Sequence, residues 1–302
     1  MNRHVDMAPD WLGGMILAAL MLSAYVCTWL IARWRRGVPP LPYSRRRQVP
    51  WNGGDVLMVV LIYIVTVGLA GQMVALLFGR PPEMPTVEQA EAVNPIIPLV
   101  RTGTGWMLAV GFLAAVVVAP IVEEFLFRVV LQGWLEAVER RWRRALPMLR
   151  RAPLALGPIL LTSFLFAMMH FRTAGPEMPQ EYIVASLIAG MAAGLTTVGF
   201  AVALLMLRAG ATAADLGWAP RKLLGDLRIG LVAFVAVVGP LYGLFIALQQ
   251  WIPKSVSADP IPLFFFAMLL GVLYHRTRRM APSVALHVAL NLTSLVLLLA
   301  AG

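Results

Sequence analysis

Residues 105–133 read GWMLAVGFLAAVVVAPIVEEFLFRVVLQG, an apolar stretch interrupted by two adjacent glutamates and one arginine. As a helix, this stretch is long enough to cross the ~30 Å hydrocarbon core of a bilayer. Ionisable side chains inside such a helix are energetically costly, and they mark functional sites in membrane proteins. We therefore take Glu123, Glu124 and Arg128 as candidate functional residues of a membrane protein.

The rest of the chain supports this interpretation, because it is 60% hydrophobic, only 13% charged and has a mean hydropathy of +0.78. Apolar runs predict an all-α polytopic membrane helix bundle of about eight transmembrane helices. No soluble segment fits between the runs, so we expect residues 1–302 to form a single integral membrane domain. The first run ends in basic residues without a small-residue cleavage site, which favours a retained span over a signal peptide. The runs cover residues 11–32, 55–79, 104–136, 154–171, 183–207, 228–251, 261–275 and 281–301.

The basic residues are distributed unevenly along the chain. Nineteen of the 25 lie in alternate loops, at 33–47, 140–151, 208–228 and 276–279. This positive-inside pattern predicts that the basic loops are cytoplasmic and that both termini are non-cytoplasmic, in the plasma membrane if the source is bacterial. The net charge of +10 therefore indicates loops that face anionic lipid and does not indicate a nucleic-acid partner. A single cysteine, Cys27, excludes an intrachain disulfide.

The first motif is the sequence EEFLFR from Glu123 to Arg128. On a helix, Glu124 and Arg128 are i,i+4 neighbours in the order that favours a salt bridge. Glu123 lies about 100 degrees further round the helix, so its side chain faces different neighbours. The pair predicts one structural carboxylate and one available carboxylate; the alternative is an ion pair that only fixes helix packing.

Two further motifs place polar side chains in apolar helices. His170 ends the sequence FAMMH, and His287 begins the sequence HVALN, which puts Asn291 on the same helix face. Taken singly, these residues would fit hydrogen bonding between helices. Taken together with Glu123, they fit hydrolysis, because a glutamate can take a proton from water, a histidine can orient that water, and an amide can stabilise an oxyanion.

The same residues leave a metal mechanism open. Glu123, His170 and His287 could form a zinc shell with a water as the fourth ligand. No HExxH helix is present, Asn291 is a poor zinc ligand, and no carboxylate behind either histidine is apparent in the sequence.

Residues 117–128, 166–170, and 269–274 with 287–291 together resemble the CPBP family of intramembrane proteases, which includes CAAX prenyl proteases of the Ras-converting type and bacteriocin-processing proteases. The resemblance implies a general base at Glu123, a partner on the same water at His170, an oxyanion site at His287 and Asn291, and support from Glu124 and Arg128. It leaves zinc open, since both metal-dependent and metal-free mechanisms are proposed for the family. The family-like core would be 105–171 and 263–298, with 183–251 as an added helical hairpin.

The function expected from the sequence is an intramembrane endopeptidase acting on a membrane-associated peptide or protein. The alternative is a polytopic membrane protein without proteolytic activity, either an ion- or proton-coupled transporter or a silent immunity or scaffold protein. Ionisable groups gather in the three motif segments, which favours the enzyme. The motifs lie at different depths along their helices. By the helical rise, Glu123 lies about 25 Å from the basic loop at Arg140, and His287 lies only about 12 Å from Arg279, so the two side chains meet only if one helix is shifted along its axis. Either the last helix starts deep or the third one protrudes.

Overall fold

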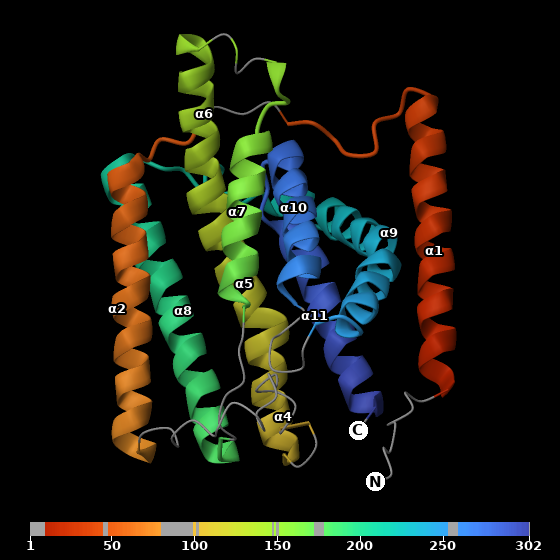
Figure 1. Ribbon diagram of the computed structural model, residues 1–302. Helices are drawn as coiled ribbons and strands as arrows, with labels where there is room; N and C mark the ends of the chain where they lie inside the picture. Colours follow the sequence, from red (N-terminus) through yellow and green to blue (C-terminus); the bar gives the residue numbers. More distant parts are fainter. Residues whose placement is uncertain are drawn as a thin grey trace.

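The computed structural model describes residues 10–44, 48–79, 99–100, 103–146, 148, 151–171, 178–252 and 259–301, and its regular structure is helical throughout these ranges. The helices run alternately up and down and form one bundle (Figure 1). They are α1 (Asp10–Arg35), α2 (Gly53–Phe78), α4 (Gly105–Phe112), η1 (Leu113–Val118), α5 (Ala119–Glu124), η2 (Phe125–Gln132), α6 (Gly133–Ala145), α7 (Leu156–Met169), α8 (Gln180–Ala209), η4 (Pro220–Lys222), α9 (Leu223–Gln249), α10 (Pro260–Thr277) and α11 (Ala281–Ala301).

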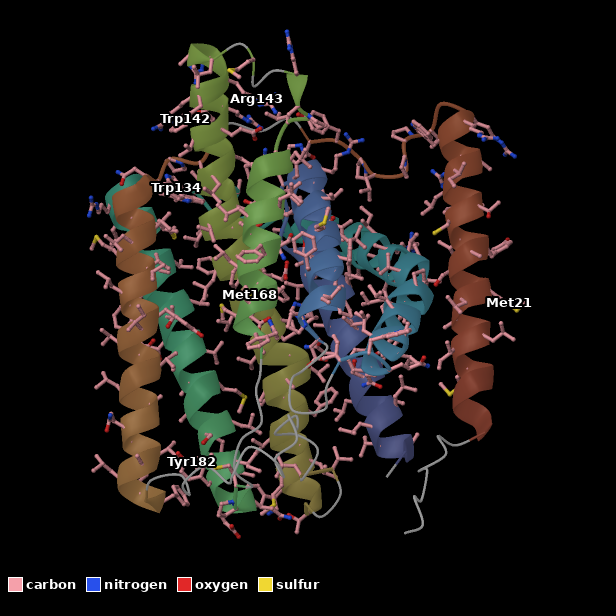
Figure 2. All side chains as sticks on the ribbon, viewed as in Figure 1. Met21, Trp134, Trp142, Arg143, Met168 and Tyr182 are labelled. Carbon is pink, nitrogen blue, oxygen red and sulfur yellow. The ribbon has the colours of Figure 1, made fainter. Side chains whose placement is uncertain are left out.

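Seven helices of the described residues are long and apolar enough to cross a membrane, and α7 is a shorter apolar helix. The predicted bundle of about eight membrane helices is therefore confirmed, and the chain is an integral membrane protein. Large apolar side chains cover its outer faces, as Met21 of α1 illustrates by pointing away from the bundle (Figure 2). Trp142 lies near one end of the bundle and Tyr182 near the other, as expected of aromatic side chains at the two membrane interfaces.

The third span is one continuous helix of 41 residues from Gly105 to Ala145. Its α6 end extends beyond the neighbouring helices (Figure 1). Of the two arrangements that would let the motifs converge, the structure therefore has the protruding third helix. Two stretches of it, η1 and η2, are wound as π-helix and flank the short α-helical turn of α5, which carries both glutamates.

The helices between the second and third motifs pack on different partners. α8 packs along α2, whereas α9 packs between α1 and α11, and α10 packs against α7. An added helical hairpin was expected over residues 183–251. The two helices there, α8 and α9, pack mainly on other helices rather than on each other, because they lie on opposite sides of the bundle (Figure 1). The division into a family-like core and an added segment stays a prediction.

Two glycines let helices approach the site closely. A Cβ atom at Gly194 of α8 would lie 3.0 Å from a methyl group of Val122, the residue before Glu123. A Cβ atom at Gly230 of α9 would lie 2.6 Å from the backbone oxygen of Pro282 and 2.6 Å from Cβ of Ala285, at the start of α11. Small residues at such crossings allow backbones to pack tightly in a membrane. The two close contacts join α8 to the glutamate helix and α9 to the His287 helix.

A buried ion pair lies just before the start of α11. Both carboxylate oxygens of Asp226, in the first turn of α9, accept from Nε of Arg279 at 2.7 and 2.9 Å. Both side chains are almost fully buried. Removing either partner would leave a buried charge uncompensated, so this pair stabilises the contact between the start of α9 and the residues just before α11.

Candidate active site

The two glutamates of α5 occupy different environments although they are adjacent. The side chain of Glu124 is fully buried, whereas that of Glu123 is 21% exposed. Successive helical residues point about 100 degrees apart, so one carboxylate enters the core while the other faces the side where the histidines lie. The carboxylates thus separate into a buried one and an accessible one.

Glu124 lies at the centre of a buried polar group. Its Oε2 atom is 3.4 Å from Nε of Arg128, which is the ion pair expected from the i,i+4 spacing. Its Oε1 atom is 3.3 Å from Nδ1 of His287. The expectation that neither histidine has a carboxylate behind it is therefore wrong for His287, because α11 crosses the buried face of α5, a tertiary contact that the sequence does not contain.

Arg128 is fully buried and is held on two further sides. Its Nη1 donates to Oγ1 of Thr162 at 3.3 Å, and its guanidinium carbon lies 5.6 Å from the centre of the Phe166 ring. Both partners belong to α7, the helix whose C-cap residue is His170. Arg128 therefore connects the glutamate helix to the first histidine helix.

Both histidines direct Nε2 at the same carboxylate oxygen. The Nε2 atoms of His170 and His287 each lie 3.8 Å from Oε2 of Glu123. This is too long for a direct hydrogen bond, and it is a separation at which a water can bridge. The motifs of three helices therefore meet at one point, on the accessible glutamate.

The opposite ring nitrogens set the orientation of each imidazole. His170 Nδ1 lies 2.8 Å from the carbonyl oxygen of Phe166. A carbonyl only accepts, so Nδ1 of His170 carries the proton and Nε2 presents a lone pair to Glu123. Nδ1 of His287 faces the Glu124 carboxylate and donates to it for the same reason.

Aromatic rings fix both histidines in place. The Phe166 ring lies 4.6 Å from the His170 ring and 5.7 Å from the His287 ring, and Phe266 packs edge-on against His287 at 5.3 Å. Neither Phe166 nor Thr162 was expected from the sequence to have a role in the site. The signal was present, since Thr162, Phe166 and His170 follow one another at i,i+4 spacing and so share one face of α7.

Asn291 lies one helical turn after His287, and its Nδ2 donates to the backbone oxygen of Ala115 at 2.7 Å. Because that oxygen accepts only, the NH2 end of the amide must face it. One N–H of Asn291 is thereby engaged, and the second N–H stays available to another acceptor.

The donor spacing does not fit a preformed zinc site. Ligand atoms at about 2.0–2.1 Å from a tetrahedral zinc ion lie about 3.3 Å from each other. Both Glu123–histidine separations are 3.8 Å, and within the described part of the chain no group of three or more His, Cys, Asp or Glu side chains is arranged to hold a metal ion.

A family model described as "Type II CAAX prenyl endopeptidase Rce1-like" matches residues 105–215 and 216–293, which are more than half of the chain. The match includes all six candidate side chains, from Glu123 to Asn291. No curated protein and no solved structure matches.

Proposed function

Because this chain belongs to the Rce1-like family of type II CAAX prenyl endopeptidases, we propose that it is an intramembrane endopeptidase that hydrolyses a peptide bond of a membrane-associated peptide or protein. The observation that carries the proposal is the pair of imidazole Nε2 atoms, each 3.8 Å from Oε2 of Glu123. In this proposal a water molecule bound among these three groups is the nucleophile.

Glu123 acts as the general base. Its carboxylate takes a proton from the bound water while the resulting hydroxide attacks the carbonyl carbon of the scissile peptide bond, forming the new C–O bond. His170 accepts a hydrogen bond from the same water through its Nε2 lone pair, because its Nδ1 proton is already donated to Phe166. The water is thus oriented by one residue and deprotonated by the other.

The oxyanion formed by this attack needs hydrogen-bond donors. In its protonated form His287 can donate from Nε2, because the buried carboxylate of Glu124 accepts from Nδ1 and balances the charge on the ring. The guanidinium of Arg128, with Nε 3.4 Å from Oε2 of Glu124, pairs with that carboxylate from the other side. The second N–H of Asn291 is the other donor of this proposal.

Collapse of the tetrahedral intermediate completes the reaction. The C–N bond breaks as protonated Glu123 returns its proton to the leaving amine, directly or through His170. The products are a new carboxyl terminus and a new amino terminus, and Glu123 is again a carboxylate. Each step uses side chains of this chain, and no step is assigned to a metal ion.

The proposed substrate is membrane-associated because the reacting groups lie in membrane-spanning helices. The proposed orientation places the basic loops on the cytoplasmic side and both termini on the other, in the plasma membrane if the source is bacterial. A prenyl group on the substrate is not required by any residue described above.

The test is a proteomic comparison of membranes that contain either the wild-type protein or Glu123→Gln, which keeps the shape of the side chain but removes the base. We expect new peptide termini near the ends of membrane spans only with the wild type. Matched amounts of both proteins in the membrane are the control. Identical patterns of termini would reject the proposed activity.

A further inference from the structure

The backbone oxygen of Ala115 has neither its α-helical nor its π-helical hydrogen-bond donor, although it lies inside a continuous helix. In an α-helix it would accept from the N–H of Ala119, four residues later. In this π-helical turn the N–H of Ala119 donates instead to Ala114. The π-helical partner of Ala115 would be residue 120, five residues later, and Pro120 has no N–H.

The free carbonyl is the acceptor of Asn291. Nδ2 of that side chain donates to it at 2.7 Å, across from α11 to η1. The pairing satisfies a backbone group that would otherwise be costly inside a membrane protein. It also excludes the flipped amide, in which two oxygens would face each other, and so keeps the NH2 group on the side of α11 that faces the Glu123 helix.

We propose that Pro120 is a positioning residue for Asn291: by withholding an N–H from the turn before the glutamates, it leaves the Ala115 carbonyl free to hold the amide. This rests on the proposed function, in which Asn291 donates to the oxyanion. Pro120 is buried, and it takes part in no step of the proposed reaction. Its effect passes through the backbone of η1 to a side chain on another helix.

The first test is a double-mutant cycle on thermal stability, which does not depend on activity. In the wild-type background Asn291→Ala leaves the Ala115 carbonyl unpaired and should lower the Tm. In the Pro120→Ala background the new N–H of residue 120 can pair with that carbonyl, so Asn291→Ala should lower the Tm less. Pro120→Ala alone should keep or raise the Tm, since proline is unfavourable inside a helix.

The second test applies the same cycle to the rate at which the reconstituted protein cleaves co-reconstituted membrane proteins from its host. Loss of an oxyanion donor in Asn291→Ala should lower the rate about 10²- to 10³-fold. Displacement of the amide in Pro120→Ala should lower it about 10²-fold. The double variant should be no slower than Asn291→Ala. If Pro120 had only a structural role, its replacement would not raise stability and lower activity at the same time. That combination in Pro120→Ala therefore distinguishes positioning from a structural role.

Pro240→Ala is the matched control, because Pro240 also lies inside a membrane helix, α9, and is exposed. The effects of Pro240→Ala on the Tm and on the cleavage rate should simply add to those of Asn291→Ala. Equal Tm losses from Asn291→Ala in both backgrounds, or full activity in Pro120→Ala, would overturn the positioning role. A different result would leave the positioning role intact but overturn the use of Asn291 in the proposed function. In that result Asn291→Ala keeps full activity, while its Tm loss is still smaller in the Pro120→Ala background than in the wild-type background.

A second variant covers the case in which Pro120→Ala does not fold. Asn291→Leu keeps the approximate volume of the side chain but has no group that can donate to the Ala115 carbonyl. It should lower both the Tm and the cleavage rate, as Asn291→Ala does. Wild-type stability of Asn291→Leu would overturn the proposal without any need for the proline variant.

Discussion

Glu123 and Glu124 show how one residue step along a helix changes the chemistry available to a carboxylate. Glu124 is fully buried between Arg128 and His287, while Glu123 is partly exposed and faces both Nε2 atoms. In the proposed mechanism the buried carboxylate acts through its two partners, and the accessible one meets the water. The difference follows from the 100-degree step, so this part of the site could be predicted from the sequence.

Arg128→Ala should lower both stability and activity. It leaves the buried charge of Glu124 without its partner, at a cost of roughly 3 to 5 kcal/mol. Thermal unfolding in detergent and the cleavage rate should therefore fall together, while Thr162→Val, which removes only one hydrogen bond of Arg128, should have a smaller effect on both. Loss of activity with an unchanged Tm would instead place Arg128 in the chemistry.

Activity should survive prolonged chelation. Oε2 of Glu123 lies further from both histidine Nε2 atoms than ligand atoms lie from one another in a tetrahedral zinc site, and no step of the proposed reaction is assigned to a metal ion. The measurement is the cleavage rate before and after dialysis against chelator, with metal analysis of the same samples. Stoichiometric zinc that is lost together with activity, and restored with it, would contradict the proposed mechanism.

At the scale of elements, the sequence predicted which helices exist and which faces carry the motifs, but not how the third helix is wound. The π-helical segments η1 and η2 depend on how Pro120 and the neighbouring helices are accommodated, and hydrophobic periodicity does not report that. The sequence also did not predict that α8 packs on α2, or that α9 packs on α1 and α11. Lipid-facing helices are apolar on all sides, so their sequences say little about partner choice.

Close packing of α9 on α11 gives a prediction at this scale. Gly230→Ala would place a methyl group 2.6 Å from the backbone oxygen of Pro282, so it should displace the helix that carries His287 and lower both Tm and cleavage rate. Gly225→Ala is the matched control on the same helix, because nothing lies within 4 Å of its added Cβ. It should be neutral or stabilising by up to about 1 kcal/mol. Similar behaviour of the two variants would show that this crossing does not hold the site.

For the whole molecule, the alternation of basic loops predicts an orientation that labelling can test. The start of α1 and the end of α11 lie at one end of the bundle, and the α6 end of the third helix lies at the other (Figure 1). In a Cys27→Ser background, Glu181→Cys should react with an impermeant maleimide added to spheroplasts. Met148→Cys should react only after permeabilisation. The reverse pattern would contradict the orientation inferred from the positive-inside rule.

In the proposed mechanism Glu123 activates water for peptide hydrolysis. The experiment for this role reconstitutes wild type, Glu123→Gln and His170→Ala in liposomes with the same membrane proteins and follows new peptide termini by mass spectrometry. Both variants should insert and unfold like the wild type. Their cleavage should fall about 10²- to 10⁴-fold, as expected when general acid–base catalysis is removed. Wild-type cleavage by folded Glu123→Gln would contradict the role of Glu123 as general base.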